Sequence, residues 1–186
     1  MTFFQALLIG LFAYLGSKRT PWFFGVTGGW NMIGRPLMAG LIVGIILGDV
    51  QNGVIAGAMV QALFIGQITP GGAMPADVNW AAYVGIPLAL AAGGTGEQAV
   101  ALSVPLSMLG LGLFNFIMTI NAYFPHMGDK AAAKGDGAGI HRATYLAAVP
   151  SFILRAGSAM LLCYLGTPVA EMLINNMPAG MLHFFE

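Results

Sequence analysis

A series of apolar runs, separated by short polar connections, constrains the fold more than any other feature of the sequence. The runs cover residues 3–16, 36–48, 53–66, 80–93, 99–120 and 143–166. A helix that crosses the hydrocarbon core of a bilayer needs about 20 apolar residues, and only the last two runs reach that length comfortably. Short hydrophobic segments interrupted by Gly and Pro are typical of discontinuous helices and re-entrant hairpins. We therefore expect an all-α integral membrane protein, a polytopic helix bundle with re-entrant helical hairpins.

The charge content supports this class. Charged residues make up 8% of the chain and the formal net charge is +0, whereas about a quarter of the residues of a soluble domain are charged. Neutrality and the lack of a basic stripe argue against a nucleic-acid partner. The single cysteine, Cys163, offers neither a disulfide nor a thiol metal site, so we expect it to be an apolar helix residue. The N-terminal run lacks a basic region and a clear cleavage site, which favours a permanent membrane segment over a signal peptide.

Glycines recur at short intervals through the second and third runs. Gly40, Gly44 and Gly48 are four residues apart, and Gly53 and Gly57 continue a face of small residues. Small residues at this spacing let helix backbones approach closely in lipid. The pattern predicts a tightly packed hairpin over residues 36–66. It leaves open whether the hairpin moves or is ordinary helix packing.

Basic residues occur in two connections. Lys18, Arg19 and Arg35 flank the first, and the stretch 121–142 carries Lys130, Lys134 and Arg142. The positive-inside rule predicts that both connections face the cytoplasm.

The stretch GQITPGGAMPAD, residues 66–77, places helix-breaking residues and a carboxylate between two apolar runs. A carboxylate at membrane depth is costly unless it is paired or faces water, so Asp77 is a functional candidate. It is equally suited to cap the helix that the following VNWAAYVGIPLAL would form, and the two roles are compatible. Asp49, in LGDVQNG, is a second candidate, for which a turn is the simpler explanation.

Neutral polar groups accompany these acids. Gln61 lies in the apolar sequence GAMVQALFIG, where its amide either holds a neighbouring helix or binds a polyhydroxylated ligand. Thr69 and other hydrogen-bonding groups lie close by in sequence. Neutral amides, a hydroxyl and one carboxylate suit a neutral sugar better than a cation, which would need more acids, or an anion, which would need an Arg or Lys.

Motifs for bond-making chemistry are lacking. The sequence has no GxSxG, HExxH, GxxxxGK[ST] or Cys/His metal spacing, so we expect no catalytic residues, no cofactor and no metal. His126 and His141 fall in the polar stretch 121–142, where solvated histidines are expected. The residues point to a transport or binding protein and not to an enzyme.

Residues 35–61, RPLMAGLIVGIILGDVQNGVIAGAMVQ, resemble the signature of the IIC component of the bacterial phosphotransferase system (PTS), mannose/fructose/sorbose family. The positions in register are Arg35, Pro36, Gly44, Gly48, Asp49, Gly53 and Gly57. The segment FPHMGDKAAAKGDGAGIHR, residues 124–142, is similar to the His-x-x-Asp-Lys-Ala loop of the family. The likeness covers nearly the whole chain, which would then be a single IIC-type transmembrane domain over residues 1–186.

The sequence departs from the family pattern at three places. Gln61 stands where the family has an acid, and Gly34 stands where a His often precedes Arg-Pro. The segment 17–34 is longer than usual. Family members also continue past the position matching Glu186, so the resemblance implies a shortened chain that lacks the last membrane segments.

The resemblance implies a permease subunit of the bacterial inner membrane that crosses it several times. It would bind a neutral hexose or amino sugar and pass it to a cytoplasmic IIB domain for phosphorylation, with a IID membrane subunit, IIA and further IIC–IID units as partners. The implied substrate-binding residues are Gln61, Thr69 and Asp77. The alternative is a truncated membrane scaffold or receptor that assembles with partners but does not transport.

Overall fold

The computed structural model describes residues 1–18, 20, 28–68 and 73–176, and over these ranges it contains helices and no strands. The expectation of an all-α membrane fold is confirmed. Thr69 lies outside the described residues. The elements are α1 (Phe3–Leu15), the π-helix η1 (Gly29–Ile33), α3 (Pro36–Leu47), α4 (Val50–Leu63), α5 (Val78–Ala91), α6 (Gly96–Asn121), α7 (Tyr123–Ala132) and α8 (Gly137–Asn175).

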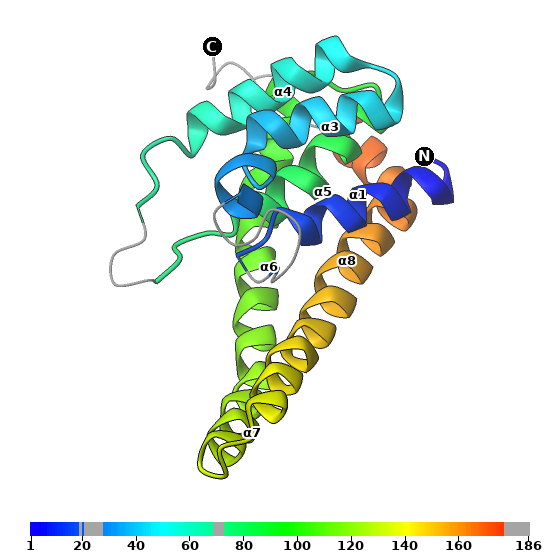
Figure 1. The fold of residues 1–186 in the computed structure, drawn as a ribbon. Coiled ribbons are helices and arrows are strands. Elements are labelled where there is room, and N and C mark those ends of the chain that lie inside the picture. Colours follow the sequence, from blue (N-terminus) through cyan, green and yellow to red (C-terminus); the bar gives the residue numbers. More distant parts are fainter. Residues whose placement is uncertain (19, 21–27, 69–72, 177–186) are drawn as a thin grey trace.

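The helices form a compact body and a long arm (Figure 1). Helices α1, α3, α4 and α5 pack together with one end of α6 and of α8. The other halves of α6 and α8 leave the body as an antiparallel pair, and α7 lies at the tip of this arm. Helix α5 is the centre of the body, since residues 78–89 are buried without interruption.

Helices α3 and α4 form the predicted hairpin, and its glycines explain why the helices lie so close. A Cβ on Gly53 would lie 2.5 Å from the carbonyl oxygen of Gly40, and one on Gly57 would lie 2.7 Å from that of Pro36. Both approaches are shorter than any real Cβ contact, so only glycine fits at this seam. The turn between the helices uses Gly48, whose φ of 84° is a left-handed conformation that favours glycine.

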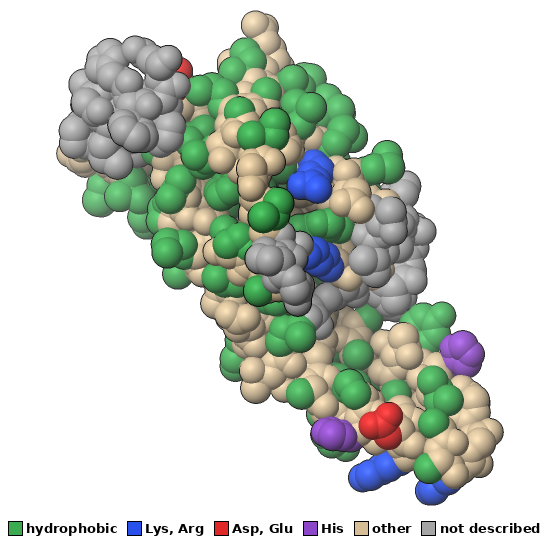
Figure 2. Space-filling view, turned by 90° about the vertical axis from the view of Figure 1, so that its left-hand side faces the viewer, with side chains coloured by type: hydrophobic (Ala, Val, Ile, Leu, Met, Phe, Trp, Pro, Cys, Tyr) green, Lys and Arg blue, Asp and Glu red, His purple; other side chains and the backbone are tan. Residues whose placement is uncertain are grey.

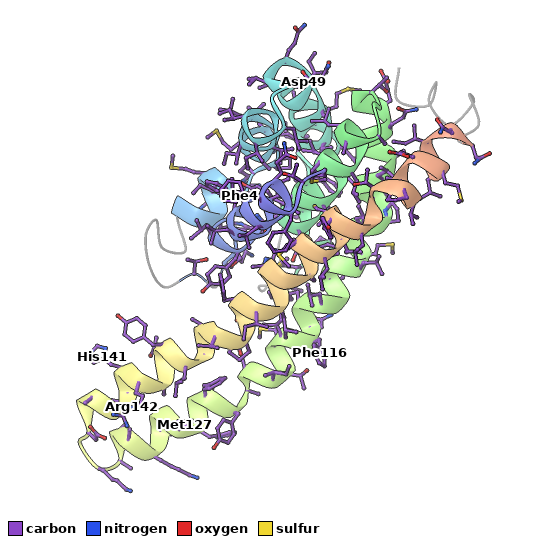
Figure 3. The ribbon with its side chains drawn as sticks, turned by 90° about the vertical axis from the view of Figure 1, so that its right-hand side faces the viewer. Phe4, Asp49, Phe116, Met127, His141 and Arg142 are labelled. Atoms are coloured by element: carbon purple, nitrogen blue, oxygen red, sulfur yellow. The ribbon has the colours of Figure 1, made fainter. Side chains whose placement is uncertain are left out.

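The arm has the composition of a membrane-spanning hairpin. Among the described residues, the helical segments Gly96–Ala132 and Gly137–Asn175 are long and apolar enough to cross a bilayer. Many large apolar side chains on these segments face outward, Phe116 among them (Figure 3). The other four apolar helices of the described ranges, α1, α3, α4 and α5, have 12–14 residues, in agreement with the short runs in the sequence.

The stretch 121–142 is more ordered than the sequence indicates. The sequence predicts a polar connection over these residues. In the structure most of them are helical, and α7 packs against the start of α8. Asp136 caps α8 by accepting a hydrogen bond from the backbone N–H of Gly139 at 2.9 Å. His126 and His141 are exposed, as predicted. Figure 2 shows charged and histidine side chains gathered at the tip of the arm.

Candidate functional site

The candidate site is at the start of α5, where Asp77 ends the stretch 66–77. The Asp77 carboxylate accepts a hydrogen bond from the backbone N–H of Trp80 at 3.0 Å, which is the predicted N-cap. The backbone N–H of Asp77 donates to the carbonyl of Ser107 in α6 at 3.1 Å. Gly110 makes room for this contact, since a Cβ there would lie 3.0 Å from that of Asp77. Asp77 is completely buried.

Burial of this carboxylate is compensated by Arg155 of α8. Arg155 Nη2 donates to Asp77 Oδ1 at 2.7 Å, and Nη1 lies 2.7 Å from Oδ2. Such a two-point contact between guanidinium and carboxylate is the strongest geometry for an ion pair. It is the single ion pair within the described ranges. Because both partners are almost fully buried, removing one would leave an uncompensated charge inside the protein.

Asn79 completes the cluster. Its Oδ1 accepts a second hydrogen bond from Arg155 Nη2, also at 2.7 Å. Arg155 Nε donates to the carbonyl of Ala13 in α1 at 3.4 Å, so the guanidinium joins α1, α5 and α8. Asn79 Nδ2 is buried and has no hydrogen-bond partner among the described residues. It faces the backbone of Gly16, where a Cβ would lie 2.5 Å away.

The cluster lies beside a narrow recess with a cavity volume of about 10 Å³, which is room for about one water molecule. Asp77 and Arg155 line it together with Ser17, Lys18, Trp30, Met74 and Phe114. Lys18 Nζ lies 4.5 Å from the ring centroid of Trp30, a cation–π contact. The recess therefore combines aromatic and apolar surface with a few charged and polar groups, which is the usual composition of a small-molecule site.

Gln61, another predicted site residue, is not part of this cluster. Gln61 is near the C-terminal end of α4, and its buried Oε1 has no hydrogen-bond partner in the described part of the chain. No described hydrogen bond links it to Asp77. Gln67 ties the two ends of the Pro/Gly stretch together, because its Nε2 donates to the carbonyl of Ala76 at 2.8 Å.

Asp49 is a cap and not a member of this cluster. Its carboxylate accepts hydrogen bonds from the backbone N–H of Asn52 at 3.2 Å and from Asn52 Nδ2 at 2.7 Å. It is exposed at the turn of the α3–α4 hairpin (Figure 3). The turn explanation for this acid is confirmed.

Sequence reasoning missed Arg155 and therefore underestimated the charge around Asp77. The missed signal is the residue itself, a lone cation within the apolar run 143–166. An ionisable residue inside a membrane segment is costly and almost always has a partner. Lys18 and Trp30 were not identified as site residues either, because they come together with Asp77 only in the folded chain.

One known protein family matches nearly the whole chain. The family described as the sorbose-specific IIC component of the PTS matches residues 3–186. The chain belongs to this IIC family. The recognition made from the Arg-Pro and Gly-Asp motifs is thereby confirmed.

Individual IIC proteins are similar over part of their length. The N-acetylgalactosamine permease IIC component 1 of Escherichia coli K12 is 29% identical over 152 residues, which are 82% of this chain and 57% of that protein. The mannose-specific EIIC component of the same organism is 34% identical over 102 residues, 55% of this chain and 38% of the relative. The chain thus spans 57% or less of the length of these relatives.

Two solved structures share the fold of this chain over its whole length. One is the cryo-EM structure of the mannose transporter ManYZ with microcin E492, with a TM-score of 0.76 and 24% identity over 73% of that chain. The other, described as a membrane protein, has a TM-score of 0.82 and 25% identity, also over 73% of its chain. This chain therefore has the fold of these membrane proteins.

Proposed function

We propose that this chain is the sugar-translocating subunit of a PTS permease. It binds a neutral hexose or amino sugar and passes it to a cytoplasmic IIB domain, which phosphorylates it. The observation that carries the proposal is the buried Asp77–Arg155–Asn79 cluster beside a recess lined by Trp30. Family membership supports the transport system, and the buried cluster supports this region as the one where a polar solute would meet the chain.

The chemistry of the recess suits a carbohydrate. The Trp30 side chain adds aromatic surface for the C–H face of a sugar ring, while Lys18, and the Asp77–Arg155 pair once the helices around it separate, would bind its hydroxyls. The buried Nδ2 of Asn79 is a further donor without a partner among the described residues. Gln61 and Thr69 are proposed as further sugar contacts.

The recess is too narrow for a sugar ring in this conformation, so transport requires the helices around it to separate. We propose that the α3–α4 hairpin region moves relative to α6 and α8, as in transporters that alternate access around a fixed site. The chain itself transfers no phosphoryl group, because the proposed partners IIA and IIB do so. Phosphorylation on the inside makes import one-way, since it converts the transported sugar into a different compound and removes the free sugar.

The proposed setting is the bacterial inner membrane, which the chain crosses several times as a single IIC-type domain. A IID subunit completes the membrane complex, and IIC–IID units assemble further. These partners are taken from the family and from the ManYZ complex. The exposed apolar side chains of the α6–α8 arm provide surface for lipid and for such partners.

Uptake of labelled sugars by cells that express the complete permease tests the proposal. Arg155→Lys keeps the charge but loses the two-point contact with Asp77, so we expect assembled permease with strongly reduced uptake. Asp49→Asn is the matched control, because Asp49 is an exposed cap. An assembled wild-type permease that takes up no sugar would instead support a scaffold or receptor. Normal uptake by assembled Arg155→Lys would remove the cluster from the site.

A further inference from the structure

We infer that the recess selects sugars whose substituents are neutral or accept hydrogen bonds, and that Lys18 rejects sugars carrying a free, protonated amine. The inference rests on the proposed function and narrows its substrate class. It predicts that an N-acetylated amino sugar or a plain hexose enters the recess, whereas the corresponding free amino sugar is excluded at acidic pH.

The side chains that line the recess carry more positive than negative charge. Two cationic side chains and one carboxylate line it, namely Lys18, Arg155 and Asp77. The carboxylate is already engaged, since both of its oxygens lie 2.7 Å from guanidinium nitrogens of Arg155. Lys18 makes no ion pair among the described residues. The recess therefore has a net positive charge.

The Lys18 ammonium lies at the recess, in contact with Trp30. Nζ lies over the ring of Trp30, 4.5 Å from its centroid, and Trp30 itself lines the recess. The ammonium thus covers one face of the indole, and a sugar that enters the recess would lie next to this positive charge. Repulsion between like charges is strong where water is largely excluded, so a cationic substituent would be rejected from this position.

The groups around the recess have hydrogen-bond donors that remain unused. Asp77 Oδ1 accepts hydrogen bonds from Arg155 Nη2 and from the backbone N–H of Trp80, and Oδ2 is neutralised by the ion pair with Arg155 Nη1. The buried cluster retains unused donors, because Asn79 Nδ2 has no partner among the described residues and the Lys18 ammonium carries three N–H groups. Unused donors favour a ligand group that accepts hydrogen bonds, such as a hydroxyl, an acetamido carbonyl or a carboxylate.

Competition uptake by cells expressing the complete permease tests the inference. The panel contains mannose, fructose, sorbose, and the plain, 2-amino and 2-acetamido forms of glucose and galactose. At pH 6 the 2-amino sugars are protonated, because such amines have a pKa of about 8. We expect the wild type to prefer the plain or acetamido form over the amino form, and Lys18→Gln to reduce that preference about tenfold, which corresponds to about 1.4 kcal/mol.

Lys134→Gln is the matched control, because Lys134 is an exposed lysine next to the turn before α8 and should leave the preference unchanged. A wild type that takes up hexoses and free amino sugars equally well, or a Lys18→Gln variant with an unaltered preference, would overturn the inference but leave sugar transport standing. Failure of the assembled wild type to take up any sugar of the panel would overturn the proposed function and the inference with it.

Discussion

The guanidinium of Arg155 and the carboxylate of Asp77, 78 residues apart in sequence, meet at 2.7 Å inside the helical body. This contact joins the first turn of α5 to the middle of α8. It places the start of α5, where the Pro/Gly stretch ends, against the long arm helix. The contact is therefore both a structural link and the polar centre of the proposed sugar site.

Breaking this ion pair should destabilise the protein. Asp77→Asn or Arg155→Gln leaves one buried charge without its partner, a change that costs about 3–5 kcal/mol. We expect each variant to lower the thermal unfolding temperature of the detergent-purified permease. In the double variant neither charge remains, so its loss should be clearly smaller than the sum of the two. Additive losses would contradict a direct interaction between the side chains.

Adding a side chain at the glycine contact between α3 and α4 should also lower the stability of the protein. A Cβ at Gly53 would lie 2.7 Å from the Cα of Gly44, so Gly53→Ala forces α3 and α4 apart at a cost of about 1–3 kcal/mol. Gly112→Ala in α6 is the control, because a Cβ there meets nothing within 4 Å. Thermal unfolding compares the two, and equal stability of both variants would contradict the close packing.

Asp49 should contribute to stability and not to sugar selection. Asp49→Ala removes the cap of α4, a loss of about 1 kcal/mol, while Asp49→Asn should lose less because asparagine is also a good cap. We expect both variants to keep the sugar profile of the wild type in competition uptake. A changed profile in Asp49→Asn would make this exposed residue part of the transport path.

Gln61→Glu restores the acid that the family signature has at this position. A carboxylate only accepts hydrogen bonds, whereas the amide also donates them, so we expect the relative uptake of hexoses that differ in one hydroxyl to change. Competition uptake with such hexoses is the measurement. If every ratio stayed as in the wild type, Gln61 would not contact the sugar.

The helices and the cap of α5 could be predicted because their signals are local. Each apolar run became a helix, and the glycine spacing predicted the α3–α4 hairpin. Asp77 was recognised as a cap because an acid directly before an apolar helix is sufficient for that role. Such features depend on residues that are neighbours in sequence.

The partners of Asp77 could not be predicted in the same way. Arg155 reaches Asp77 only because α8 returns from the arm and crosses the body (Figure 1). Lys18 and Trp30 join the recess through the packing of the segments around α1. No periodicity in a single sequence encodes such contacts, although a lone arginine in an apolar run indicates that a partner exists.

The seam between α3 and α4 has a mechanical consequence. Backbone lies directly on backbone there, with no side chains between that could switch rotamers and let the helices shift gradually. The pair should therefore travel as one rigid piece during a transport cycle. Two spin labels, one on each helix of the pair, would keep a constant separation, and only their distances to a label on α8 would change.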